Sequence, residues 1–530
     1  MTAVELRYKV GKKRGGVIVK NEKTTVPKSK PPVKINPRAS GVLVHPTSFP
    51  SPYCMGDLGE NAYEFIDFLK SARQKLWQIL PLGPTGFGDS PYQSFSSFAG
   101  NPYLISPELL KEQGFLDDGD LANIPEHNPR VVDFGPAIAF KLAILRKAFE
   151  NFKKNASPQI KGSVTKFVKA NSSWIEDYTL FMALKNHYEG IEWFKWPDGL
   201  KKREKTAIEA ARKEHSEEID FHKFIQYEFF RQWGKLKAYA KSAGVSIIGD
   251  LPIFVAHDSS DVWANTKLFL MDEDGNPSSV AGVPPDYFSE TGQLWGNPLY
   301  NWEEHKRTGY GWWIRRLLGV FNVVDIVRID HFRGFESYWA VPYGEDTAIK
   351  GKWVKGPGKA FFAAIKNELG ELPIIAEDLG EIDEKVNNLR RWANLPGMRV
   401  LQFAFTPGGE STHLPHNYED QNTVVYTGTH DNNTTRGWYC EAPEHEKDYV
   451  RRYMNVSGED IAWDLIRLAF STSANTAIVP IQDLMDLESS DRMNSPGLSD
   501  GWWRFRYTKE MLGTALSARL KYLTELFNRV

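Results

Sequence analysis

The sequence predicts an α/β protein built on a (β/α)8 TIM barrel, with large, mainly helical insertions between the barrel strands. Eight short apolar runs, most with β-branched residues, alternate with longer amphipathic stretches. Such runs are typical of parallel strands buried on both faces, and eight of them alternating with helices indicate a barrel. The runs are Val42–His45, Leu76–Leu80, Val245–Gly249, Val323–Ile329, Leu372–Ala376, Arg399–Phe403, Thr423–Tyr426 and Ala477–Ile481.

The helices are predicted from apolar spacing. Within Asn61–Arg73, the residues Ala62, Phe65, Ile66 and Leu69 follow the i, i+3, i+4, i+7 pattern of one helix face. Further helices are predicted over Ala360–Leu369, Ile382–Ala393, Lys509–Phe527, Ile138–Lys153, Trp174–His187, Leu200–Glu218 and Phe221–Ala243.

The 530 residues exceed the roughly 250 that a plain barrel needs, and the excess falls in two long gaps between strands. We therefore predict a catalytic barrel over 39–530 that carries a helical insertion subdomain at about 104–243. An active-site loop region is predicted at about 251–322. Within it, Ala281–Asn301 is rich in Gly, Pro and aromatic residues, and we interpret it as an ordered loop over a site.

The first 38 residues form a basic N-terminal extension with eleven Lys/Arg and two acidic residues, or +9. Subtracting this from the net charge of −2 leaves −11 for residues 39–530. We predict a flexible or loosely docked tail, either a solvated extension or a targeting segment. Two cysteines favour a reducing compartment, so the predicted location is the cytoplasm, or a plastid if the tail is a targeting remnant. The near-zero net charge disfavours nucleic-acid binding. The sequence contains no run of 18 apolar residues, so we predict no membrane-spanning helix.

Other motifs were tested for cofactor or metal chemistry. Gly351–Lys359 has Pro357 where a phosphate loop needs lysine, and no G-x-S-x-G nucleophile motif occurs. The pair His413 and His416 lacks a third ligand, and the calcium-loop start at Asp272 lacks its glutamate. The sequence therefore predicts neither a cofactor nor a metal.

Acidic residues follow three of the predicted strands. They are Asp330, Glu377 and Asp431, and Asp250 after the third run adds a fourth. In a barrel these strand ends converge on the face that carries the active site. A single acid there could be a helix N-cap, and an acid cluster could bind magnesium. The whole set suits glycosidic-bond cleavage best, in which one carboxylate attacks and a second, protonated one donates to the leaving oxygen.

At these residues the sequence resembles the amylomaltases, the 4-α-glucanotransferases of glycoside hydrolase family 77. The resemblance spans residues 40–530. It implies a retaining mechanism in which Asp330 is the nucleophile, Glu377 the general acid/base and Asp431 a transition-state stabiliser. The motifs that carry it are His45–Ser48, Leu80–Tyr103, Gly249–Phe254, Val280–Asn301, Val327–Gly334, Ala376–Gly380 and Thr427–Thr435.

The same resemblance implies a set of substrate-binding residues beside the three acids. Asp250 joins this set as an acid able to bind sugar hydroxyls, and Phe288 as an aromatic in the loop over the cleft. Two departures from the family pattern are Cys54-Met55, where many relatives have Gly-Ile, and the basic tail. The substrate-binding residues are Ser90, Tyr92, Asp250, Asp286, Phe288, Gln293, Trp295, Arg328, His331 and His430.

Three functions fit these residues. The first is transfer of an α-1,4-glucan segment to a glucan or to glucose as acceptor, with maltooligosaccharides, amylose, and glycogen or starch fragments as substrates. The second is an amylase-type hydrolase that uses water instead, since the first half-reaction is shared. The third is a catalytically silent glucan-binding protein, which predicts loss of at least one of the three acids, and all three are present.

Overall fold

The computed structural model describes residues 38–285, 289–405, 409–498 and 501–530. Eight parallel strands form a barrel in the order β10-β11-β12-β1-β2-β3-β6-β9. The barrel closes where the Ala376 amide at the end of β9 donates to the carbonyl of Pro396, just before β10, at 2.9 Å. The strands are β1 (Ala39–Leu43), β2 (Leu76–Gln78), β3 (Ser246–Pro252), β6 (Ile326–Asp330), β9 (Ile374–Ala376), β10 (Gly397–Val400), β11 (Thr423–Tyr426) and β12 (Thr476–Pro480).

All eight predicted strands are confirmed, with ends shifted by a few residues, and so is the barrel. Nearly every strand residue is buried, as expected for a sheet covered on both faces. The closeness of neighbouring strands explains Gly41 in β1, since a Cβ there would lie 2.4 Å from the carbonyl oxygen of Leu76.

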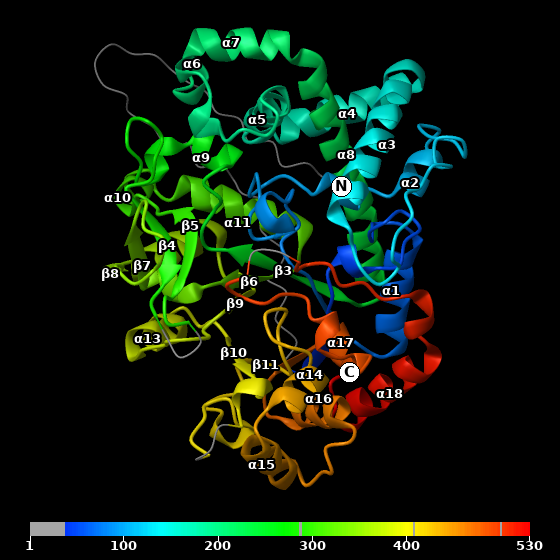
Figure 1. Ribbon diagram of the computed structural model, residues 1–530, viewed down its shortest axis with the longest axis vertical. Coiled ribbons are helices and arrows are strands. Elements are labelled where there is room, and N and C mark those ends of the chain that lie inside the picture. Colours follow the sequence, from blue (N-terminus) through cyan, green and yellow to red (C-terminus); the bar gives the residue numbers. More distant parts are fainter. Residues whose placement is uncertain (1–37, 286–288, 406–408, 499–500) are drawn as a thin grey trace.

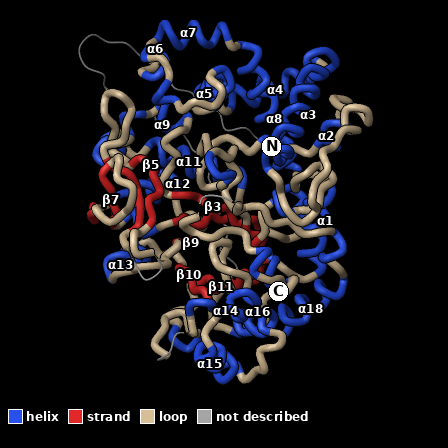
Figure 2. Tube along the Cα trace, in the orientation of Figure 1, coloured by secondary structure: helices blue, strands red, loops and turns tan. Residues whose placement is uncertain are grey.

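Helices surround the barrel strands, which form the centre of the molecule (Figure 2). Those outside the long gaps are α1 (Glu60–Ser71), α12 (Gly358–Leu369), α13 (Glu384–Trp392), α14 (Thr435–Glu441), α15 (Glu444–Met454), α16 (Ile461–Ser471), α17 (Ile481–Leu484) and α18 (Thr514–Leu526). Among the described residues, no helix is long and apolar enough to cross a membrane.

The gap between β2 and β3 is filled by helices, as the apolar spacing predicts, but the helix predicted over Leu200–Glu218 is interrupted at 202–204 and again at His215. They gather at one end of the molecule, at the top of Figure 1, opposite α14–α18. The division into a separate subdomain at about 104–243 stays a prediction. The helices are α2 (Pro107–Lys111), α3 (Phe134–Asn155), α4 (Pro158–Ala170), α5 (Ile175–His187), α6 (Asp198–Lys201), α7 (Lys205–Glu214) and α8 (Ser216–Ser242). Between β3 and β6 lie α9 (Ser260–Ala264), α10 (Trp302–Arg307) and α11 (Gly311–Val323).

A second sheet corrects the prediction of a loop over 281–301. Four antiparallel strands pair in the order β5-β4-β7-β8. The segment interpreted as a loop contributes the end of β4 and all of β5, and its described residues outside these strands are 284–285, 289–292 and 299–301. The strands were not predicted because the segment is rich in Gly and Pro and because β5 is buried only at its last two residues, so it lacks a continuous apolar run. The strands are β4 (Ser279–Val283), β5 (Gln293–Pro298), β7 (Ser337–Pro342) and β8 (Lys352–Lys355).

Candidate active site

The acids predicted to converge come from the carboxyl-terminal ends of parallel barrel strands. Asp330 is the last residue of β6, and Glu377 follows β9 directly. Strand register brings these two together: Ile329 pairs with Ala376, and the amide of Glu377 donates to the carbonyl of Ile329 at 3.0 Å. Asp250 of β3 lies opposite Arg328 of β6 in the same way.

Arg328 joins two of the carboxylates. Its Nη1 lies 2.8 and 2.6 Å from the two oxygens of Asp250 and 3.0 Å from Oδ1 of Asp330. The arginine side chain is only 3% exposed. Burial lowers its pKa, but the facing carboxylates outweigh this and raise it well above the ordinary value, so the guanidinium stays charged.

Neighbouring groups shift the pKa of the Asp330 carboxyl in opposite directions. Burial raises its pKa and Asp250, Glu377 and Asp431 raise it further, whereas Arg328 lowers it, and the net pKa lies well above the ordinary value. The Asp330 side chain is 28% exposed, so it lies at the open end of the cluster, while the Asp250 side chain is fully buried. Arg328 is therefore the group that favours an ionised, accessible Asp330.

Glu377 is fixed by two backbone amides. Its Oε2 accepts from the amide of His331 at 2.7 Å, and its Oε1 accepts from the amide of Leu379 at 2.8 Å. The left-handed backbone of His331, with φ 52°, belongs to the turn that presents this amide. Burial raises the pKa of Glu377, while Arg328 and the two amides oppose the shift. The net rise suits a group that must carry a proton to its substrate.

The neighbouring Asp378 faces away from this cluster, as strand alternation predicts. Its carboxylate accepts from the amide of Met398 at 2.6 Å and pairs with Arg390 at 3.1 Å. This buried acid therefore anchors the β9–β10 junction.

Asp431 connects to the cluster through His430 and Tyr92. Nε2 of His430 lies 3.3 Å from Oδ2 of Asp431 and 2.9 Å from the Tyr92 hydroxyl, which donates to Asp250 at 2.7 Å. The Tyr92 and His430 rings stack with centroids 5.3 Å apart. Burial lowers the pKa of His430, so a neutral ring can donate from Nε2. One network thus links Asp431 to Asp250 and, through Arg328, to Asp330.

Three further residues of this site are not predicted by the sequence. Asn494 donates from Nδ2 to Oδ1 of Asp431 at 2.6 Å, and Arg492 donates to the backbone carbonyl of Asp431. The Trp503 ring packs near Tyr92 and His430, with centroids 5.7 and 6.0 Å away. All three lie between β12 and α18, in a stretch without periodicity, and no sequence signal marks them.

Trp295 and Gln293 of β5 lie beside the glutamate-binding turn. The Trp295 indole donates to Oε1 of Gln293 at 3.1 Å, and its ring stands edge-on to His331 with centroids 4.8 Å apart. Burial lowers the pKa of His331 to about 4. The Ser90 hydroxyl accepts from the amide of Tyr92 at 3.2 Å, so it shapes the turn that carries that ring.

Two of the predicted substrate-binding residues, Asp286 and Phe288, lie outside the described residues. Within the described part of the chain, no group of three or more His, Cys, Asp or Glu is arranged to hold a metal ion.

A closed parallel barrel with a raised-pKa glutamate beside an arginine-paired aspartate defines a class, the carbohydrate-active barrel enzymes that act on glycosidic bonds. Residues 44–512 match the family model described as 4-alpha-glucanotransferase in glycoside hydrolase family 77. The chain belongs to this family.

Individual relatives agree over nearly the whole length. A 4-alpha-glucanotransferase of Thermus thermophilus is 50% identical over 501 residues, which is 93% of this chain and 99% of that protein. The 4-alpha-glucanotransferase DPE1, chloroplastic/amyloplastic, of Arabidopsis thaliana is 44% identical over 499 residues, 93% of this chain and 86% of that protein. The amylomaltase of Streptococcus agalactiae in complex with acarbose has a TM-score of 0.90 at 42% identity, covering 93% of this chain and 99% of that one.

Proposed function

We propose that this protein transfers a segment of a 1,4-α-glucan to the 4-hydroxyl of an acceptor glucan or of glucose, with retention at the anomeric carbon. The observation that carries the proposal is the pairing of Asp330 with Arg328 next to an amide-held Glu377 of raised pKa. Family membership supports transfer over hydrolysis.

In the first half-reaction, the Asp330 carboxylate attacks the anomeric carbon and forms an ester bond to it. The bond from that carbon to the leaving oxygen breaks, and Glu377 gives its proton to that oxygen. In the second, the acceptor 4-hydroxyl returns a proton to Glu377 while its oxygen attacks the anomeric carbon. The ester to Asp330 breaks, and both carboxyl groups regain their starting states.

The surrounding residues are assigned supporting roles. The Asp431 carboxylate stabilises the positive charge that develops on the sugar ring in both transition states. Arg328 opposes the rise in the Asp330 pKa and so favours the ionised form of the nucleophile. The proposed substrate contacts are those of Ser90, Tyr92, Asp250, Asp286, Phe288, Gln293, Trp295, His331 and His430.

Transfer requires the covalent intermediate to survive attack by water, so the acceptor has to be held and oriented beside it. Incubation with maltotriose tests this directly. We expect glucose and a ladder of longer oligosaccharides. A product mixture restricted to maltose and glucose would instead establish the hydrolase.

The variant Asp330→Ala tests the nucleophile. Disproportionation should be abolished while glucan binding, measured by titration calorimetry, remains. Asp346→Ala is the matched control, because Asp346 is an exposed aspartate outside the site. Activity retained in Asp330→Ala would refute the assignment.

The proposed location is the cytoplasm, with a plastid as the alternative. Two free cysteines, buried Cys54 and exposed Cys440, support a reducing compartment. The plant relative's name supports the alternative. Expression of a fluorescent fusion with and without residues 1–38 separates the two, because only a targeting segment would change the location.

A further inference from the structure

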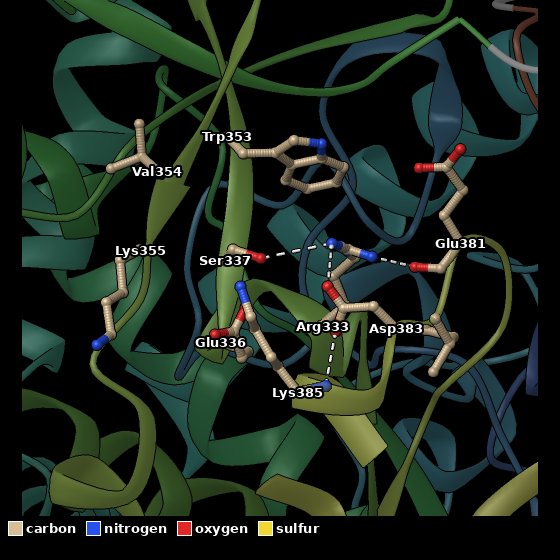
Figure 3. Close-up of a pocket in the computed structure, with 10 residues that line it drawn as sticks. Arg333, Glu336, Ser337, Trp353, Val354, Lys355, Glu381, Asp383 and Lys385 are labelled. Atoms are coloured by element: carbon tan, nitrogen blue, oxygen red, sulfur yellow. Dashed lines mark hydrogen bonds and ion pairs between the residues drawn. The ribbon is translucent and has the colours of Figure 1, made fainter. Parts of the chain in front are cut away.

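A cavity of about 680 Å³ is lined partly by the segments that follow Asp330 and Glu377 in the chain. Figure 3 shows the residues that line it. Ligand-binding pockets commonly measure about 300–1,000 Å³. None of the residues assigned a role in the chemistry above lines this cavity. Its walls come from the segments that follow β6 and β9 and from the edge strand β8.

The cavity is built on the catalytic loops. Arg333 follows Asp330 by three residues, and Glu381 follows Glu377 by four. The Arg333 guanidinium donates to the backbone carbonyl of Glu381 through Nη1, and its Nη2 lies 3.4 Å from the Ser337 hydroxyl. The two loops are therefore joined at the cavity wall.

Aromatic surface is available in this cavity. Trp353 of β8 lies over the Arg333 guanidinium, with 3.9 Å between the guanidinium carbon and the ring centroid. The Trp339 ring packs edge-on against the Trp353 ring, with 5.2 Å between the ring centroids. The Trp353 residue is still 39% exposed. Arg333 is 8% exposed, and its Nε has no hydrogen-bond partner. The indole is thus held rigidly while part of it stays open to a ligand.

The charges around the cavity balance. Cationic and acidic side chains are equal in number, so a charged ligand would meet like charge from one half of them. A neutral polyhydroxylated ligand can accept hydrogen bonds from one set and donate to the other, and its apolar ring face can pack on Trp353. The charged lining residues are Arg333, Lys355, Lys385, Glu336, Glu381 and Asp383.

We propose that this pocket binds the acceptor glucan beyond its first glucose unit, with Trp353 as the packing surface. The acceptor's first glucose must touch Glu377, because its 4-hydroxyl exchanges a proton with that group. A pocket that adjoins the Glu377 loop without containing Glu377 fits the following units. This inference rests on the proposed transfer function.

The test uses amylose as donor and compares maltotriose with glucose as acceptor, following the acceptor-dependent loss of iodine staining. Trp353→Ala should raise KM for maltotriose about tenfold, the scale of one lost aromatic anchor. KM for glucose should stay within about twofold, since glucose fills only the first position. Trp353→Phe, which keeps a ring, should recover most of the maltotriose affinity.

Trp392→Ala is the control, since Trp392 is an exposed tryptophan at the end of α13 that does not line the cavity. An unchanged KM for maltotriose in Trp353→Ala, or an equal rise for glucose, would overturn the proposal. If the unaltered enzyme forms no ladder, the transfer function fails instead. In that case, calorimetry of maltotriose binding to the Asp330→Ala variant and to the Asp330→Ala, Trp353→Ala double variant still tests the pocket. Weaker binding to the double variant supports the pocket, and equal affinity refutes it.

Discussion

Removal of the Asn494 side chain should weaken catalysis through Asp431. The Asn494 amide donates to Oδ1 of Asp431 at 2.6 Å, while His430 lies 3.3 Å from the other oxygen. The Asn494 contact therefore fixes the orientation of a carboxylate that must face the transition-state charge. Asn494→Ala leaves Oδ1 of that carboxylate to bind water, so its orientation is held less firmly.

The magnitude follows from the type of hydrogen bond. A bond to a charged group contributes about 1.5–3 kcal/mol. The Asp431 side chain is 40% exposed, so water replaces part of the lost bond and the lower end applies. About 1.5 kcal/mol corresponds to a decrease of about tenfold in kcat/KM for maltotriose disproportionation.

Three variants make this test decisive. Asn186→Ala is the control, because it also removes an amide from a carboxylate, Glu218 at 2.6 Å, but at an exposed position outside the site. In a double-mutant cycle, Asn494→Ala should cost little once Asp431→Asn is present, because the two share one effect. A loss below twofold in the single variant, or full additivity in the cycle, would refute the positioning role.

Three further outcomes are expected. Glu377→Gln should lower maltotriose cleavage by about 10²–10⁴-fold yet cleave maltotriosyl fluoride almost normally, since fluoride leaves without a proton; equal losses on both substrates would contradict the acid role. Arg328→Met removes the cation that lowers the Asp330 pKa, so the acidic limb of the pH–kcat/KM profile should move to higher pH, and a fixed limb would exclude that role. Burial lowers the pKa of His305 to about 4. In the unfolded chain His305 takes up a proton near pH 6.5, whereas in the folded protein it does so only near pH 4. The free energy of unfolding therefore falls as the pH drops from about 6.5 toward 4, by about 2 kcal/mol at pH 5. His305→Phe should shrink the loss of thermal stability between pH 7 and pH 5, and an unchanged loss would contradict this account.

The barrel could be predicted because its strands are buried on both faces and therefore read as short, mostly apolar runs. The four-stranded sheet gives no such signal. In β8, Lys352–Lys355, three of four residues are exposed, and β5 alternates until its last two residues. Such strands are held by pairing with distant neighbours, as β4 pairs with β7 across about sixty residues, and the local sequence does not encode that pairing.

The same distinction applies to the site. Asp330 and Glu377 could be predicted because a strand end fixes where their side chains must lie. Asn494 and Trp503 come from an irregular segment after β12, and only the folded chain brings them to Asp431 and His430. Their side chains carry no chemistry that distinguishes them in the sequence from ordinary surface residues.

Two of the three tryptophans of the small sheet connect this unpredicted element to the reaction. Trp295 of β5 contacts His331, and Trp353 of the opposite edge strand β8 contacts Arg333. Both contacts are made to the segment that directly follows β6, the strand that ends at Asp330. In this segment the amide of His331 donates to Glu377. Carboxylates at the ends of barrel strands can serve hydrolysis and transfer equally well, because both begin with the same covalent step. What separates the two is a surface that binds a second sugar chain next to that intermediate, and the acceptor pocket proposed at Trp353 would supply that surface from this sheet.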